Sequence, residues 1–307
     1  MKQKNYDDYW FHYVLSENPI KIKEAIKETN IISEDSKIHI DVYGDEIVTD
    51  KNIIFIHGTS VYSKFYAEFC YNLYKQGYRV IAPDLIGHGL SDGRRGHFTM
   101  ENFTNIIYDL TSHIIANYGE NVVVMGSSLG GIATLYCVAN DSRLKGAICH
   151  NAAIFNEEAY KRIINLKGIL KLLIRIIPII AKLFPKLKLS VFIYLDFYEL
   201  GKTDEILESI DFLLEDELFT NKYTLTAIKT QMRAPMKRPI EEIDIPMMII
   251  NGDNDNLFSV DYMKELYDRL NVKNKELAII KDASHLIFQE NIKESLDNIV
   301  PWLEKIL

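Results

Sequence analysis

The stretch NVVVMGSSLGGIATLYCVA, residues 121–139, predicts both the fold and the reactive group of this chain. An apolar, β-branched run leads into glycines, and an apolar helical pattern follows directly, which is the order of a buried strand, a tight turn and a helix. Gly126, Ser128 and Gly130 form G-x-S-x-G in that turn. Such a turn strains its central residue and lifts the side chain above the sheet. Ser128 is therefore the predicted nucleophile, favoured over Ser127 by position, and a glycine-rich turn with an incidental serine is the alternative.

Further short runs rich in β-branched residues lie on both sides of this stretch and alternate with helical patterns. These further runs occupy residues 38–43, 52–56, 78–82, 145–150, 246–250 and 276–280, in addition to the strand at 121–125. This alternation predicts an α/β fold with a mostly parallel central sheet and helices on both faces. Several runs are apolar throughout, as strands buried on both faces must be, and we place them in the middle of the sheet.

The strand rhythm stops in one long segment, which predicts the domain organisation. Between about residues 154 and 237 helical periodicity dominates and no convincing strand is found. We therefore expect a helical cap inserted at 154–237 between a first part of the core, 37–153, and a second part, 238–307. Residues 1–36 are interpreted as a peripheral N-terminal helical extension.

Composition limits the classes of partner and compartment. The chain has 307 residues, 48% hydrophobic and 25% charged, and a formal net charge of −8, which disfavours nucleic acid. Cys70, Cys137 and Cys149 form no CxxC pair and are expected to be buried thiols in a reducing compartment. The N-terminus lacks the pattern of a signal peptide, and no window reaches the ~20 apolar residues of a membrane span. We expect a cytoplasmic protein.

A serine hydroxyl is a weak nucleophile and needs a histidine that accepts its proton. In this kind of fold the histidine follows the serine in the chain, and His285 is the one histidine beyond residue 150. It lies in KDASH, just after the strand ELAII, where open α/β sheets carry functional residues. His285 is the predicted general base, and a solvated loop histidine is the alternative.

The carboxylate that orients the histidine is expected after the preceding strand, in PMMIINGDNDNLF. Asp253 and Asp255 both follow that strand. Asp255 is favoured because it is third after Gly252, where a turn returns a carboxylate to the end of the sheet, whereas Asp253 fits a residue that caps the turn.

Two backbone N–H groups are expected to bind the oxyanion. The first belongs to Leu129 at the helix N-terminus, and the second to Thr59, which follows the strand IIFI and His57-Gly58. His57 precedes the nucleophile and is expected to hold its loop through side-chain hydrogen bonds. The segment APDLIGHGLSDG, residues 82–93, is interpreted as a structured turn. No metal-ligand cluster or dinucleotide-binding loop is found, so no cofactor and no metal are expected.

Taken in order, these motifs resemble the α/β-hydrolase superfamily over about residues 37–307. The run GHGLSDGRRGHF, residues 87–98, is similar to the monoacylglycerol lipase and lysophospholipase branch, which includes serine aminopeptidase-like members. The resemblance implies a serine hydrolase. The chain departs from that branch at Ser127, where relatives usually have histidine, and this leaves the subfamily and substrate in doubt.

The expected cap is basic and apolar between Tyr160 and Leu195. It contains no Asp or Glu and carries eight cations: Lys161, Arg162, Lys167, Lys171, Arg175, Lys182, Lys186 and Lys188. On a helix most of them form a stripe beside an apolar surface, which is the pattern of an ordinary solvated cap face. The same pattern allows a lipophilic pocket over the serine or contact with an anionic membrane surface.

The leading hypothesis is hydrolysis of carboxylic esters with a lipophilic acyl group, such as monoacylglycerols or lysophospholipids, through an acyl-serine intermediate. The same triad would also serve a thioesterase, a peptidase or a carbon–carbon hydrolase. A hydrolase-like receptor for a small ligand is the alternative outside enzymology, and a complete set of Ser128, Asp255 and His285 argues against it because a binding protein needs no oriented base.

Overall fold

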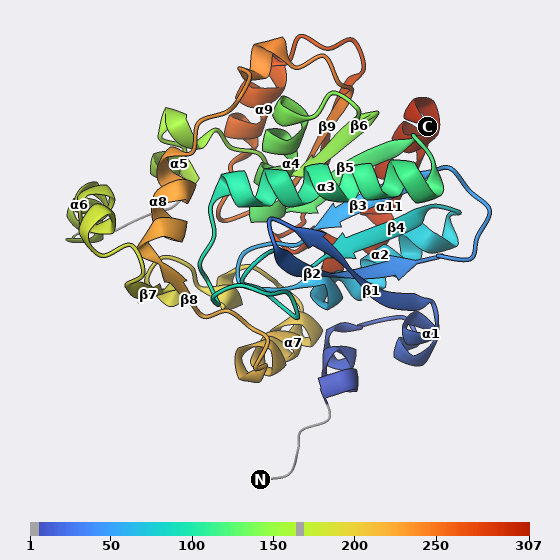
Figure 1. The fold of residues 1–307 in the computed structure, drawn as a ribbon, viewed down its shortest axis with the longest axis horizontal. Helices are drawn as coiled ribbons and strands as arrows, with labels where there is room; N and C mark the ends of the chain where they lie inside the picture. Colours follow the sequence, from blue (N-terminus) through green and yellow to red (C-terminus); the bar gives the residue numbers. More distant parts are fainter. Residues whose placement is uncertain (1–5, 164–168) are drawn as a thin grey trace.

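A computed structural model describes residues 6–163 and 169–307, and an eight-stranded sheet forms its centre (Figure 1). The order across the sheet is β1-β2-β4-β3-β5-β6-β9-β10. The strands are β1 (Ile26–Ser33), β2 (Ser36–Tyr43), β3 (Asn52–Ile56), β4 (Arg79–Pro83), β5 (Val122–Ser127), β6 (Gly146–His150), β9 (Met247–Gly252) and β10 (Lys275–Ile280). The strands from β4 to β10 in this order are parallel, and β1 and β2 pair antiparallel. The predicted fold class is confirmed, and each predicted strand is present.

Helices cover both faces of the sheet, as Figure 1 shows. The helices α3 (Met100–Tyr118) and α4 (Leu129–Asn140) pack together on one face, while α2 (Ala67–Lys75) and α11 (Ile292–Ile306) pack on the other, and α9 (Val260–Arg269) packs against β9 and β10. All five residues of β3, NIIFI, are buried. A strand covered on both faces needs apolar side chains on both, which is why the four residues after Asn52 show no polar alternation.

The N-terminal region differs from the predicted helical extension. It contains η1 (Tyr6–Tyr13) and α1 (Pro19–Glu24), but residues 26–33 form the edge strand β1. Glu34 and Asp35, at φ +47° and +60°, close a two-residue turn that pairs β1 with β2. The helical prediction for 26–33 was wrong. An edge strand buries few side chains, so this segment lacks the apolar run by which the other strands were predicted.

The segment between β6 and β9 lies over one end of the sheet, at the left and lower left of Figure 1. Its helices are η3 (Phe155–Glu157), α5 (Tyr160–Ile163), α6 (Ile169–Leu183), η4 (Val191–Ile193), η5 (Phe197–Glu199), α7 (Asp204–Glu215), α8 (Leu225–Arg233) and η6 (Ile240–Glu242). It also holds a small antiparallel pair, β7 (Lys188–Ser190) with β8 (Lys222–Thr224), which corrects the expectation that this segment has no strand. Three residues are too few to show a strand period. The boundaries proposed for the cap stay a prediction.

The N-terminal helix η1 fastens the cap to the core. The hydroxyls of Tyr13 in η1 and Tyr62 both donate to Asp216 Oδ2 at 2.6 Å, directly after α7. Tyr9 Oη donates to the carbonyl of Phe212 in α7 at 2.8 Å. Tyr62 lies just before η2 (Ser63–Tyr66) in the loop that follows β3. These contacts hold α7 over the carboxyl end of the sheet.

The structure bears on two expectations drawn from composition, the state of the cysteines and the presence of membrane-spanning helices. Cys70, Cys137 and Cys149 are buried and unpaired, as predicted, and burial raises the pKa of each thiol. Among the described residues, we find no helix whose length and apolar character would let it cross a bilayer.

Candidate active site

Ser128 occupies the sharp turn between β5 and α4. Its backbone has φ +56° and ψ −118°, a left-handed conformation that L-residues rarely adopt and that projects the side chain above the sheet. The Ser128 N–H donates to the carbonyl of His150 at 2.9 Å, which ties the turn to the neighbouring strand β6. A Cβ on Gly131 would lie 2.1 Å from that same carbonyl oxygen, so only glycine lets α4 approach β6 this closely.

His285 and Asp255 form a hydrogen-bonded pair beside this turn. Asp255 follows β9 and His285 follows β10, and His285 Nδ1 lies 2.8 Å from Asp255 Oδ2. The other carboxylate oxygen, Oδ1, accepts the N–H groups of Leu257 at 2.7 Å and Phe258 at 3.0 Å. Of the two candidate acids, Asp255 contacts the histidine, while Asp253 is exposed.

The electrostatics of Asp255 keep it charged. Burial by itself raises the pKa of this carboxyl, but the charge and hydrogen bond of His285, together with the Phe258 N–H, outweigh burial and hold the pKa at about 2. The carboxylate is thus ionised at any pH near neutrality, and it can orient the imidazole and stabilise its protonated form.

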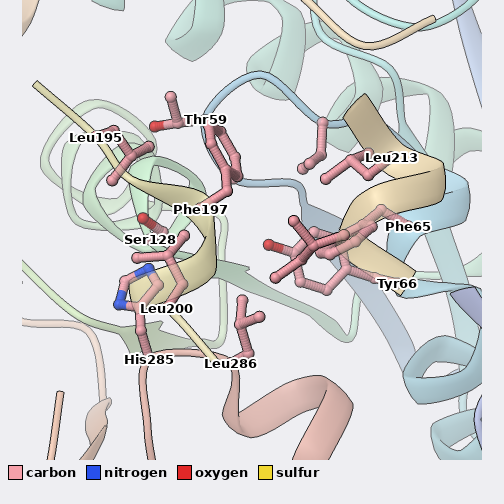
Figure 2. Close-up of a pocket in the computed structure, with 13 residues that line it drawn as sticks. Thr59, Phe65, Tyr66, Ser128, Leu195, Phe197, Leu200, Leu213, His285 and Leu286 are labelled. Atoms are coloured by element: carbon pink, nitrogen blue, oxygen red, sulfur yellow. The ribbon is translucent and has the colours of Figure 1, made fainter. Parts of the chain in front are cut away.

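Ser128 and His285 meet at the wall of one cavity. Figure 2 shows the Ser128 hydroxyl beside the His285 ring, with Thr59 on the opposite side of the serine. Leu129 is the first residue of α4, where a helix leaves its N–H groups without partners inside the helix. The structure thus brings together all five residues predicted for the triad and the oxyanion hole: Ser128, Asp255, His285, Thr59 and Leu129. Their catalytic roles stay a prediction.

Two small cavities adjoin the serine. The His285-side cavity, of about 30 Å³, is lined by Gly58, Thr59, Val61, Phe65, Tyr66, Ser128, Leu195, Phe197, Leu200, Ile210, Leu213, His285 and Leu286 (Figure 2). The Leu129-side cavity, of about 70 Å³, is lined by Thr59, Ser128, Leu129, Ile132, Phe155, Ile163, Tyr194, Leu195, Gln231, Leu257 and Phe258. A cavity needs about 10–15 Å³ of such space to hold one water molecule, so this conformation has room for a few small groups.

The cap supplies apolar walls to both cavities, but from other elements than expected. Leu195 lines both cavities, and α7 contributes Ile210 and Leu213 to the His285-side cavity. The described side chains of α6, from Ile176 onward, line neither cavity, and Ile179 is 63% exposed. Of the expected basic stripe, Lys182 and Lys186 are exposed; Lys167 lies outside the described residues, as do the side chains of Lys171 and Arg175.

His57 holds the loop that carries Thr59, as predicted. Its Nδ1–H donates to the Gly58 carbonyl at 2.9 Å, and its Nε2 accepts the Leu85 N–H at 3.0 Å. Burial lowers the pKa of His57, so the imidazole is neutral as this pattern requires. The segment 82–93 is a structured turn around buried Asp84, whose carboxylate accepts the backbone N–H groups of Ser63 and Leu90.

Sequence reasoning missed a second histidine at the site, His150. It is fully buried at the end of β6, its Nδ1 lies 2.9 Å from Ser127 Oγ, and its ring centroid is 5.4 Å from that of His285. Burial and the neighbouring His285 lower its pKa to about 3. The sequence could have predicted this position. His150 is the last residue of the run KGAICH, and parallel strands end at the same edge of a sheet, so its side chain was expected near Ser128 and His285.

Asn151 was also missed. Its backbone is left-handed, at φ +65°, and its Nδ2 donates to Asp255 Oδ2 at 3.0 Å. Asp255 therefore accepts hydrogen bonds from two side chains and two backbone groups, and the site holds its carboxylate in one orientation.

Two clusters among the described residues bring three potential metal ligands within 4.8 Å: His150 with Asp255 and His285, and Glu28 with His39 and Asp41. In the first cluster, His285 Nδ1 and Asp255 Oδ2 are hydrogen-bonded to each other, so these two atoms are not free to bind a metal ion. In the second, the Lys64 ammonium pairs with Glu28 and lies 3.8 Å from Asp41 Oδ1, so it supplies the positive charge that a cation would.

Comparisons with known proteins add to this geometry. The family profile described as serine aminopeptidase, S33, matches residues 48–292. A monoglyceride lipase homolog of Monkeypox virus is 25% identical over 272 residues, covering 85% of this chain and 92% of that protein. The crystal structure of Paleococcus ferrophilus monoacylglycerol lipase superposes with a TM-score of 0.70 at 24% identity, covering 83% of this chain and 95% of the other. A soluble variant of monoglyceride lipase from Saccharomyces cerevisiae gives 0.73 at 18% identity, covering 91% and 94%.

Proposed function

Because the chain belongs to the serine aminopeptidase S33 family, we propose that it hydrolyses carboxylic esters at Ser128 through an acyl-serine intermediate. Family membership confirms the predicted resemblance to the monoacylglycerol lipase and serine aminopeptidase-like branch of α/β-hydrolases, and supports a hydrolase of lipase or esterase type. One observation carries the proposal: the ionised Asp255, whose side chain is buried, is hydrogen-bonded to His285 beside a serine in a left-handed turn.

The proposed reaction has two halves. Ser128 Oγ attacks the ester carbonyl carbon while His285 Nε2 takes the serine proton, and the N–H groups of Thr59 and Leu129 bind the oxyanion. The bond from carbon to the alcohol oxygen then breaks, and His285 returns the proton to that oxygen. Water attacks the acyl-serine, giving up a proton through His285, and releases the carboxylic acid with Ser128 restored.

The acyl group is proposed to be lipophilic, as it is in monoacylglycerols and lysophospholipids. The support is the apolar lining of the Leu129-side cavity, where Ile132, Phe155 and Ile163 adjoin the serine. Burying each methylene group of an acyl chain contributes about 0.8 kcal/mol. Since the cavity holds about 70 Å³, a long chain needs the cap to move outward from α4. The same catalytic residues would also cleave a thioester, an amide or a carbon–carbon bond. A receptor of this fold would bind a ligand at the same site without hydrolysing it.

A fluorophosphonate probe tests the proposal directly, because it reacts with serines that a base activates. We expect rapid labelling of the wild-type chain, none in Ser128→Ala, and full labelling in the control Ser142→Ala, which changes an exposed serine far from the turn. Hydrolysis of p-nitrophenyl butyrate should follow the same order. A folded wild-type protein that neither labels nor hydrolyses esters would favour the receptor.

We also propose that the cap contacts anionic membrane surfaces. The support is an exposed apolar ridge, defined as Ile179, Leu183, Phe184 and Leu187, which are 63%, 72%, 60% and 52% exposed. Exposed Lys182 and Lys186 lie within it, and basic amphipathic surfaces favour anionic interfaces.

Sedimentation with vesicles tests this contact. Wild-type protein should sediment with vesicles that contain phosphatidylglycerol more than with pure phosphatidylcholine, and Leu183→Ser should release it. Ile32→Ser is the matched control, because Ile32 is 70% exposed on the edge strand, away from the ridge. Equal sedimentation of wild type and Leu183→Ser would refute the contact.

A further inference from the structure

The two cavities lie on chemically different sides of the serine. His285 lines one of them and Leu129 lines the other, while Thr59 and Ser128 line both. In ester cleavage the histidine returns a proton to the departing alcohol oxygen, so that oxygen must lie within hydrogen-bond reach of the imidazole. The oxyanion occupies the N–H groups of Thr59 and Leu129. The alcohol therefore extends into the His285-side cavity, and the acyl chain takes the Leu129 side.

The His285-side cavity is poor in polar groups. Apart from Ser128 and His285, its polar lining is Thr59 and the Tyr66 phenol, and none of the described residues that line it carries a formal charge. The Tyr66 hydroxyl lies close to Gly58, and burial raises the pKa of Tyr66 to about 12, so the phenol stays neutral. Val61, Phe65 and Leu286 line the same cavity with apolar side chains that offer a headgroup no hydrogen-bond partner.

We infer that the ester's alcohol is an uncharged, apolar alkyl alcohol and that glycerol and charged headgroups are discriminated against; this rests on the proposed ester hydrolysis. A buried hydroxyl without a hydrogen-bond partner costs about tenfold or more in binding, and a buried unpaired charge costs more. An added alkyl carbon contributes up to about fourfold until the cavity is full. The inference narrows the substrate from lipophilic esters in general to alkyl esters.

A panel of esters with one acyl group and different alcohols tests the inference. We would measure kcat/KM of the full-length protein for ethyl butyrate, butyl butyrate, glyceryl monobutyrate and butyrylcholine. Butyl butyrate should exceed glyceryl monobutyrate by about tenfold or more, and butyrylcholine should be the poorest substrate. Equal or faster hydrolysis of the glyceryl or choline ester would overturn the inference and leave the ester hydrolase standing. No hydrolysis of any ester, with no fluorophosphonate labelling, would remove the proposed function itself.

Two matched variants test which side binds the alcohol. Val61→Thr places a hydroxyl in the His285-side cavity with little change of shape, and it should lower the ratio of butyl to glyceryl ester hydrolysis severalfold. Ile163→Thr makes the same kind of change in the Leu129-side cavity, and it should leave that ratio unchanged while reducing the preference for hexanoate over butyrate ethyl esters. Each readout is a ratio within one variant, so partial unfolding cancels. The opposite pattern, with Ile163→Thr altering the alcohol ratio, would show the assignment reversed.

Discussion

Replacing Asp255 with asparagine tests the orientation of His285 most sharply. Oδ1 of Asp255 accepts two backbone N–H groups, at 2.7 and 3.0 Å, and Oδ2 accepts from His285 at 2.8 Å and from Asn151 at 3.0 Å. An amide has a single oxygen. If that oxygen keeps the backbone bonds, the amide NH2 faces His285 Nδ1, which must then accept, so the imidazole proton moves to Nε2 and points at Ser128. If the amide flips, its NH2 meets two backbone donors.

In the first orientation His285 loses the ability to take the serine proton in its ground-state tautomer. The flipped orientation keeps the tautomer but is disfavoured, because the amide NH2 then faces two backbone N–H groups. The same tautomer loss in a Ser-His-Asp triad lowers kcat by about four orders of magnitude, or about 5.5 kcal/mol. We therefore expect Asp255→Asn to reduce kcat/KM for p-nitrophenyl butyrate by about 10⁴, with an unchanged circular dichroism spectrum at neutral pH.

The matched control is Asp253→Asn, two residues earlier, whose side chain is exposed. It should keep wild-type kcat/KM within about twofold, since surface substitutions rarely matter. Loss of activity in Asp253→Asn, with Asp255→Asn retaining more than a tenth, would refute both the choice of acid and the tautomer argument.

Three further predictions follow from the same neighbourhood. Ser127→Ala leaves the buried His150 Nδ1 without its partner and should lower the free energy of unfolding by about 1–3 kcal/mol in urea titrations, while the Ser128 serine still labels with fluorophosphonate. The depressed pKa of Asp255, about 2 against about 3.9 unfolded, stabilises the fold at neutral pH by on the order of 2 kcal/mol. Because the folded-state value is the lower one, this contribution is present above pH ~4 and declines as pH falls toward 2, and wild type should lose more stability than Asp255→Asn between pH 5 and 3. Gly131→Ala puts a methyl group 2.1 Å from the His150 carbonyl oxygen and should yield insoluble or markedly less stable protein, whereas a soluble, fully active variant would contradict the close approach of α4.

The core of the fold was predictable because its strands are buried on both faces. In NIIFI at 52–56 four consecutive apolar residues follow Asn52, and the structure places that run in β3 with the predicted bounds. The edge strand β1 gave no such signal, since Lys27, Glu28 and Ile32 face solvent. Residues 26–33 form a strand because they pair with β2 across the turn at 34–35. That pairing depends on the sequence of β2 as well, so the pattern of residues 26–33 alone could not predict it.

The positions of the site residues followed from chain order and from strand ends, and the structure brings the predicted residues together. The cavity walls did not follow. Leu195, Ile210 and Leu213 come from the cap, where no strand register fixes which side chains face the serine. The sequence predicted an apolar surface beside a basic stripe between Tyr160 and Leu195, yet the described part of α6 turns Ile179 and Leu183 outward. An amphipathic pattern predicts that a face is apolar and leaves open what that face contacts.

His150 contacts Ser127, the position before the nucleophile at which the resemblance to the monoacylglycerol lipase branch implies a histidine. Ser127 is the residue of β5 paired in register with His150 of β6, so the small serine side chain leaves room for an imidazole from the adjacent strand. Its Nδ1 lies 2.9 Å from the Ser127 hydroxyl, and with a pKa of about 3 the ring is neutral throughout the pH range in which Asp255 is charged. A neutral ring adds no positive charge that would compete with His285 for the Asp255 carboxylate. An imidazole thus still lies behind the nucleophile turn, supplied by the next strand, and a search of the G-x-S-x-G motif alone cannot find it because the two residues are 23 positions apart.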